Sequence, residues 1–140
     1  MSLRIHVFSA LHRLVYEASG GRVGANLVRM PVLLLTTTGR SSGTRRTVPL
    51  TYLEDGDDLV LVASYGGSPT HPAWYLNLEA NPEVEVQIGR ERRPMRARRA
   101  TPEERARLWP RVVEAYHGYA GYQRRTRREI PLVVLEVAHG

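Results

Sequence analysis

A turn rich in arginine, glycine and hydroxyl side chains is the densest set of anion-binding groups in this sequence of 140 residues. An apolar run over residues 32–38 leads into it, and strand-like sequence resumes after it. The glycines allow a tight backbone, the hydroxyls add donors, and the arginines supply fixed, forked positive charge. The turn consists of Gly39, Arg40, Ser41, Ser42, Gly43, Thr44, Arg45 and Arg46. Such a loop suits a phosphate or a polycarboxylate, and it equally suits a solvated hairpin with solubilising arginines.

Other residues offer no complete catalytic constellation. The sequence has no GxSxG, HExxH or P-loop motif, its five histidines lack metal-ligand spacing, and cysteine is absent. We interpret His71 as a loop residue rather than a catalyst. This pattern favours chemistry carried by a bound cofactor, with the protein supplying binding and orientation, and it predicts no metal site.

Three tyrosines recur at every third position, Tyr116, Tyr119 and Tyr122. On a helix this spacing places them on one face or its edge. The functional interpretation is a substrate-pocket wall that stacks on aromatic compounds and donates a hydrogen bond. Gly118 and Gly121 would weaken the helix and allow a mobile cover. The alternative is a stripe of tyrosines packed on the core.

The elements that must position these residues follow from local patterns. Helices are expected over residues 2–18 and 72–81, and from Thr101 through a kink near Pro110. Strands are expected over residues 31–38, 47–54, 59–65, 83–88, 91–99 and 130–137. Short strands with frequent turns predict a small barrel or sandwich. The length predicts a single domain over residues 1–140, with an amphipathic helix over 1–20 and a linker over 21–30.

The overall amino-acid composition limits the kinds of partner that the protein is expected to bind. The net charge is +6, and all 20 basic residues are arginines, which favours an anionic partner. No nucleic-acid motif accompanies them, so we expect no nucleic-acid partner. No stretch of about 18 apolar residues is present, and residues 1–20 lack the uninterrupted apolar region expected of a signal peptide. The lack of cysteine fits a cytoplasmic location. The N-terminal helix most simply packs on the domain, and peripheral membrane association through it is the minority interpretation.

Several segments together resemble the deazaflavin (coenzyme F420)-dependent nitroreductase family over residues 30–137. They are TTTGRxSG at 36–43, PxWYLNLxANPxVxVQ at 72–87, Leu108-Trp109-Pro110, the tyrosine-rich segment 116–123 and the closing segment 128–134. The resemblance implies an α+β, mainly β fold, the split β-barrel of the flavin and deazaflavin reductases. It also implies hydride transfer from reduced coenzyme F420 to an electron-poor acceptor, such as a quinone, a nitroaromatic or nitroimidazole, or a conjugated enone.

The same resemblance implies roles for individual residues. The phosphate and polyglutamate tail of coenzyme F420 would be bound by Arg40, Ser41, Ser42 and Arg46. The planar ring would be lined by Thr47, Val48, Pro49, Leu50, Thr51, Val62, Ala63, Ser64, Tyr65, Ala73, Trp74, Tyr75, Leu76, Asn77 and Tyr119. The acceptor would meet Thr51, Tyr116, Tyr119 and Tyr122, with Ser64, Tyr119 and Tyr122 as catalytic residues.

Two positions depart from the family pattern, and two other functions stay open. Ser41 and Tyr65 stand where relatives have lysine, which removes charge near the expected tail site, while Arg45 adds charge nearby. The first alternative is a flavin-nucleotide-dependent reductase of the same fold. The second is a non-enzymatic relative that binds a lipid or another apolar ligand. A small-molecule acceptor is the expected partner, and a homodimer is left open.

Overall fold

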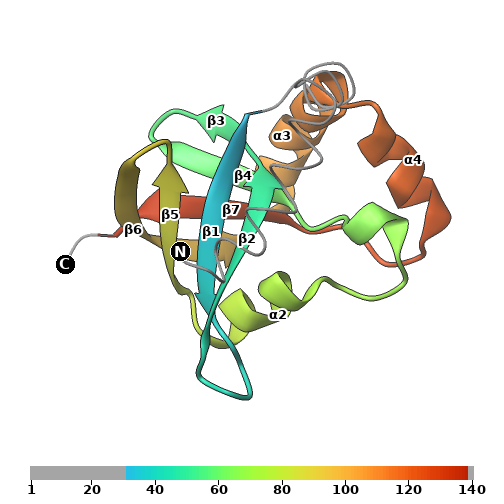
Figure 1. Cartoon of the computed structure of the whole chain (residues 1–140). Helices are drawn as coiled ribbons and strands as arrows, with labels where there is room; N and C mark the ends of the chain where they lie inside the picture. Colours follow the sequence, from blue (N-terminus) through green and yellow to red (C-terminus); the bar gives the residue numbers. More distant parts are fainter. Residues whose placement is uncertain (1–30, 139–140) are drawn as a thin grey trace, which may run out of the picture.

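The computed structural model describes residues 31–138 and shows a strongly curled, antiparallel sheet with helices against it (Figure 1). The expected N-terminal helix and linker lie outside these residues. Seven strands hydrogen-bond in the order β2-β1-β5-β6-β7-β4-β3. They are β1 (Val32–Thr38), β2 (Arg45–Thr51), β3 (Leu53–Asp55), β4 (Asp58–Val62), β5 (Glu83–Ile88), β6 (Glu91–Arg99) and β7 (Leu132–Val137). The helical elements are η2 (Tyr65–Gly67), α2 (Ala73–Ala80), α3 (Pro102–Ala115) and α4 (Gly118–Arg125).

The sheet curls because β2 and β3 are consecutive in the chain but lie at opposite ends of the strand order. β2 pairs with β1, β3 pairs with β4, and only Tyr52 separates them. The Tyr52 backbone N–H donates to the Pro31 carbonyl at 3.0 Å, and its side chain is buried. The single strand expected over residues 47–54 is therefore broken at Tyr52. The result confirms the expected small, mainly β barrel, which stays open between β2 and β4.

Strand alternation fills the barrel interior. On β1 the buried residues are Leu33, Leu35 and Thr37, and on β5 they are Val84 and Val86, as period-2 patterning predicts. The opposite face of β4 and β7 is also apolar, because α3 and α4 cover it with Leu108, Val112 and Tyr119. α2 contributes Tyr75 and Leu78 to the interior cluster and lies at one end of the barrel (Figure 1).

The N-terminus of α3 is capped by Thr101, as its sequence predicts. Thr101 Oγ1 accepts from the Glu104 N–H at 3.2 Å, and Glu104 Oε1 accepts from the Thr101 N–H at 2.8 Å, which forms a capping box. Pro110 lies inside α3, which continues as one helix to Ala115. No helix among residues 31–138 is long and apolar enough to cross a membrane.

Candidate functional site

Two adjoining cavities lie beside the open part of the barrel, and both are lined by Val48, Ala73 and Trp74. The first, which we call the arginine cavity, has a volume of about 470 Å³. Its lining comprises Thr37, Gly39, Arg40, Ser41, Ser42, Arg46, Val48, Ala73, Trp74 and Asn77. The second, the tyrosine cavity, has a volume of about 570 Å³. Its lining comprises Val48, Pro49, Leu50, Thr51, Val62, Ser64, Tyr65, Gly66, Pro72, Ala73, Trp74, Tyr116, Tyr119 and Tyr122.

The loop between β1 and β2 forms one end of the arginine cavity. It is closed by backbone hydrogen bonds, from the Gly39 N–H to the Thr44 carbonyl at 2.7 Å and from the Gly43 N–H to the Gly39 carbonyl at 2.9 Å. Gly43 has φ +72°, a left-handed conformation that favours glycine. Arg46 lines the cavity whereas its neighbour Arg45 does not, as expected where successive side chains of a strand alternate.

Asn77 ties α2 to this loop. Its Oδ1 accepts from the Arg40 backbone N–H and from Arg40 Nη1, both at 3.1 Å, and its Nδ2 donates to Thr37 Oγ1 at 3.2 Å. The Asn77 side chain is buried, so these bonds satisfy polar atoms that would otherwise be unpaired. The residue was expected to line the ring. In the structure it lines the arginine cavity and not the tyrosine cavity, and it fixes the Arg40 side chain and backbone. The sequence feature that could have indicated this role is a polar residue, Asn77, within the apolar run WYLNL.

The tyrosine cavity lies where β2 and β4, which do not pair in the sheet, face one another. β2 supplies four consecutive residues, 48–51, and Val62 and Ser64 stand opposite. Ser64 is buried and lies two residues after Val62, the last residue of β4. The strand expected to continue to Tyr65 ends at Val62, and Tyr65 is instead an exposed residue of η2 with φ +47°.

The three tyrosines gather over this cavity. The Tyr116 and Tyr119 ring centroids are 5.1 Å apart, and Tyr122 lies 6.1 Å from each, all in edge-to-face geometry. Tyr119 Oη lies 2.8 Å from Thr51 Oγ1, and Tyr116 Oη lies 3.1 Å from Tyr122 Oη. Burial raises the pKa of Tyr119, and the hydrogen bond with Tyr122 followed by burial raises the pKa of Tyr116. Both hydroxyls therefore stay protonated near neutral pH.

The tyrosines do not share one helix, contrary to the expectation from their spacing. Tyr116 ends α3 in an extended conformation, while Tyr119 and Tyr122 belong to α4. Gly118 explains the break, because a Cβ there would lie 2.5 Å from the Tyr116 ring. Glycine at this position makes room for the ring.

Four residues expected around the ring do not line either cavity. Ala63 and Tyr75 are fully buried in the barrel interior, and Leu76 packs against that cluster. Thr47 Oγ1 lies 2.8 Å from Thr36 Oγ1 across the β1–β2 pair. The alternation of strand side chains and the docking of α2 on the core turn these side chains away. Conversely, sequence reasoning missed Thr37, Gly66 and Pro72, whose types carry no distinctive chemical signal.

The donor set of the arginine cavity fits an anionic group, and the tyrosine cavity fits a planar one. Among residues 31–138, no three His, Asp or Glu side chains gather to hold a metal ion. A half-open barrel with a basic cavity adjoining an aromatic one is the architecture expected of split-barrel flavin and deazaflavin reductases.

Comparisons with known proteins give the family. The model described as F420H(2)-dependent quinone reductase matches residues 9–137. An F420H(2)-dependent quinone reductase of Mycobacterium tuberculosis is 45% identical over 129 residues, which cover 89% of this chain and 87% of that protein. A solved F420-H2 dependent reductase is 48% identical, with a TM-score of 0.69 and coverage of 76% of this chain and 94% of its own. A second solved relative, described as a domain-swapped dimer, is 41% identical, with a TM-score of 0.70 and coverage of 96% and 100%.

The chain therefore belongs to the F420H(2)-dependent quinone reductase family. This confirms the resemblance to deazaflavin-dependent reductases and the split-barrel fold. It supports coenzyme F420 over the flavin-nucleotide alternative and an enzyme over a non-enzymatic ligand carrier.

Proposed function

We propose that this protein is an oxidoreductase that uses reduced coenzyme F420 to reduce a quinone. Its family membership supports the cofactor and the acceptor class. The observation that carries the proposal is the junction of the two cavities at Val48, Ala73 and Trp74. An elongated cofactor with an acidic tail and a planar ring needs a basic end and an aromatic end in contact. Nitroaromatics and conjugated enones are further candidate acceptors.

The arginine cavity would hold the phosphate and the polyglutamate tail. Arg40 and Arg46 provide charge-assisted hydrogen bonds, and Ser41 and Ser42 add hydroxyl donors. Asn77 fixes Arg40 before the cofactor arrives, which lowers the conformational entropy lost on binding. Because Ser41 stands where relatives have lysine, the arginines would supply the positive charge of this cavity.

The tyrosine cavity would hold the deazaflavin ring and the acceptor. Bound reduced coenzyme F420 supplies the hydride. The apolar part of the wall, formed by Val48, Leu50 and Val62, would exclude water, and Trp74 would stand between the tail and the ring. Ser64 Oγ would orient the ring or the acceptor by hydrogen bonding.

The tyrosine hydroxyls would orient the acceptor. A single hydrogen bond between Tyr116 and Tyr122 uses one of their two protons, so one O–H remains to donate to a quinone oxygen. Tyr119 contributes its ring to the same wall. Because the pKa values of Tyr116 and Tyr119 are raised, these phenols act as hydrogen-bond donors and not as bases.

A comparison of cofactor affinities tests the proposal. The protein is titrated with coenzyme F420 and, separately, with flavin mononucleotide, and binding is followed by ligand fluorescence. We expect tighter binding of coenzyme F420. Tighter binding of flavin mononucleotide would overturn the assignment.

For the assembly, we propose a cytoplasmic homodimer. One solved relative is described as a domain-swapped dimer, and the chain lacks the cysteines that oxidising compartments favour. The molar mass of the protein in solution tests the dimer, and a monomer at micromolar concentration would contradict it.

A further inference from the structure

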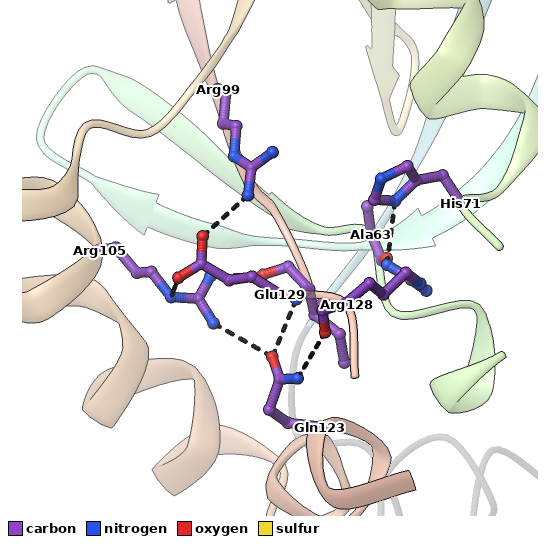
Figure 2. Close-up of polar contacts among 8 residues, drawn as sticks. Ala63, His71, Arg99, Arg105, Gln123, Arg128 and Glu129 are labelled. Carbon is purple, nitrogen blue, oxygen red and sulfur yellow. Dashed lines mark hydrogen bonds and ion pairs between the residues drawn. The ribbon is translucent and has the colours of Figure 1, made fainter. Parts of the chain in front are cut away.

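The guanidinium of Arg128 lies against the loop that follows β4 (Figure 2). Its Nη2 donates to the Ser64 carbonyl at 2.7 Å, its Nε to the Ser68 carbonyl at 2.8 Å, and its Nη1 to the Ala63 carbonyl at 3.2 Å. One side chain thus holds the two ends of the turn formed by residues 64–68.

The turn between these carbonyls contains one strained residue. Tyr65 has φ +47°, a left-handed conformation that is costly for a residue with a Cβ, whereas Gly66 and Gly67 adopt φ +64° and +82° without strain. Only two backbone hydrogen bonds close the turn internally, from the Gly67 N–H to the Ser64 carbonyl at 2.9 Å and from the Ser68 N–H to the Tyr65 carbonyl at 3.0 Å. Such a segment keeps its conformation only when its surroundings over-determine it. Residues 64–66 line the tyrosine cavity, so the conformation of this turn determines the shape of one cavity wall.

The segment around Arg128 also fixes the opposite wall. Gln123 of α4 donates through Nε2 to the Arg128 carbonyl at 2.8 Å and accepts through Oε1 from the Ile130 N–H at 2.8 Å (Figure 2). α4 carries Tyr119 and Tyr122. Gly67 packs directly on this helix, since a Cβ there would lie 2.7 Å from the Tyr122 carbonyl. Arg128 therefore connects the turn with Ser64 to the helix with Tyr122.

The acceptor set requires the forked geometry of arginine. Nη1 also lies 3.0 Å from His71 Nδ1, which makes four acceptors around one guanidinium. No carboxylate within residues 31–138 forms an ion pair with Arg128, so carbonyl dipoles and a neutral histidine surround its charge. Burial, and then the charge of Arg128, lowers the pKa of His71, in agreement with an unprotonated Nδ1 acceptor. A lysine ammonium has three donors and no fork, and it cannot reproduce this arrangement.

We propose that Arg128 is a positioning residue that sets the distance between the Ser64 wall and the Tyr122 wall of the tyrosine cavity. This inference rests on the proposed function, because the two walls are where the ring and the acceptor would meet. Arg128 is not among the cavity-lining residues, so it acts through the backbone of the turn and through α4.

The test compares Arg128→Lys with Arg105→Lys. Arg105 belongs to the same network, where it donates to the Ile130 carbonyl and to Gln123 Oε1 and pairs with Glu129 at 3.2 Å (Figure 2). Its guanidinium stacks over Trp109, and none of its hydrogen bonds within residues 31–138 reaches the turn of residues 64–68. Amide hydrogen exchange is measured at Gly67 and Ser68, together with kcat and KM for a soluble naphthoquinone and the Kd of coenzyme F420.

In Arg128→Lys we expect exchange at Gly67 and Ser68 to become at least about tenfold faster, because the turn loses the bonds at its ends. We expect kcat/KM for the quinone to fall about tenfold or more, since small misplacements of reacting groups are costly. The Kd of coenzyme F420 should change less than about threefold, because its tail binds in the other cavity. Arg105→Lys should leave the exchange at Gly67 and Ser68 unchanged, because Arg105 has no hydrogen bond to the turn.

A second pair of variants covers the case in which Arg128→Lys does not fold. His71→Leu removes one acceptor and should move exchange and kcat/KM in the same direction by a smaller factor. His71→Asn, which keeps an acceptor near the Nδ1 position, should restore both. Unchanged exchange, or unchanged quinone kinetics, in a folded Arg128→Lys or in His71→Leu would overturn the proposal. An inactive wild-type protein would overturn the proposed function instead, and faster exchange in Arg128→Lys would still establish the ordering role of Arg128.

Discussion

Tyr119 Oη lies 2.8 Å from Thr51 Oγ1, and this contact joins α4 to β2 across the tyrosine cavity. The Tyr119 side chain is buried, with 6% of its surface exposed, so its hydroxyl is committed to a partner within the protein. Tyr116 and Tyr122 are only partly buried and have one proton to offer. We therefore expect Tyr119 to shape the cavity and Tyr122 to meet the acceptor.

The Tyr119–Thr51 contact makes a prediction about stability. Tyr119→Phe and Thr51→Val should each lower the free energy of unfolding by about 1 kcal/mol, because the first leaves the half-buried Thr51 hydroxyl without its partner and the second leaves the buried Tyr119 hydroxyl without its partner. Denaturant unfolding of the two single variants and the double variant forms a double-mutant cycle. We expect a coupling of about 0.5–1.5 kcal/mol. Strictly additive losses would show that the two hydroxyls do not interact.

The arginine loop makes a prediction about cofactor affinity. Arg40→Ala and Arg46→Ala should each weaken binding of coenzyme F420 by about 1–3 kcal/mol, the scale of a charge-assisted hydrogen bond. Arg45→Ala is the matched control, since Arg45 is adjacent but does not line the cavity. The losses should shrink for a cofactor fragment without tail and phosphate. Equal effects of all three substitutions would indicate a general charge effect and not a binding site.

Tyr122 makes a prediction about the acceptor. Tyr122→Ala should raise KM for the quinone or lower kcat, while the affinity for coenzyme F420 stays within about 1 kcal/mol, the scale of one lost ring contact. Tyr122→Phe separates the ring from the hydroxyl, because it keeps stacking and removes the donor. Loss of cofactor binding in Tyr122→Ala would place this residue with the cofactor instead.

Glu104 makes a prediction about acid stability. Arg98 binds this carboxylate with both Nη atoms, at 2.7 and 2.8 Å, and with the capping box it lowers the pKa of Glu104 from 4.5 to about 2. A lowered pKa contributes stability that is present above pH 4.5 and lost as the pH falls toward 2. The pair is partly exposed to solvent, so we expect a contribution of about 1 kcal/mol. Glu104→Gln should flatten the dependence of the unfolding free energy on pH in this range, and an unchanged slope would contradict the assignment.

The sequence was sufficient to predict those structural features that depend on residues close together in the chain. The arginine turn, the Thr101 cap and the alternation of β5 are all local patterns, and the structure reproduces them. The break at Tyr52 was missed, because it arises when the ends of the sheet approach one another. Residue types alone also could not show that Ala63 and Tyr75 face the barrel interior.

Polar contacts between residues far apart in the chain were the hardest features to predict from the sequence. The acceptors of Arg128 precede it by 57 to 65 positions, and no local pattern distinguishes this arginine from its neighbours. The tyrosines show the intermediate case. Their spacing predicted that they lie together, which their ring contacts confirm, but the helix break at Tyr116 depends on how its ring packs against Gly118.

The most direct test of the central claim is the oxidation of reduced coenzyme F420 by a soluble naphthoquinone, followed anaerobically by the absorbance of the oxidised cofactor. We predict saturable turnover that requires the protein, is not supported by reduced flavin mononucleotide, and is weakened in Arg46→Ala but not in Arg45→Ala. A rate no greater than that of the reaction without protein, or faster turnover with reduced flavin mononucleotide, would contradict the account.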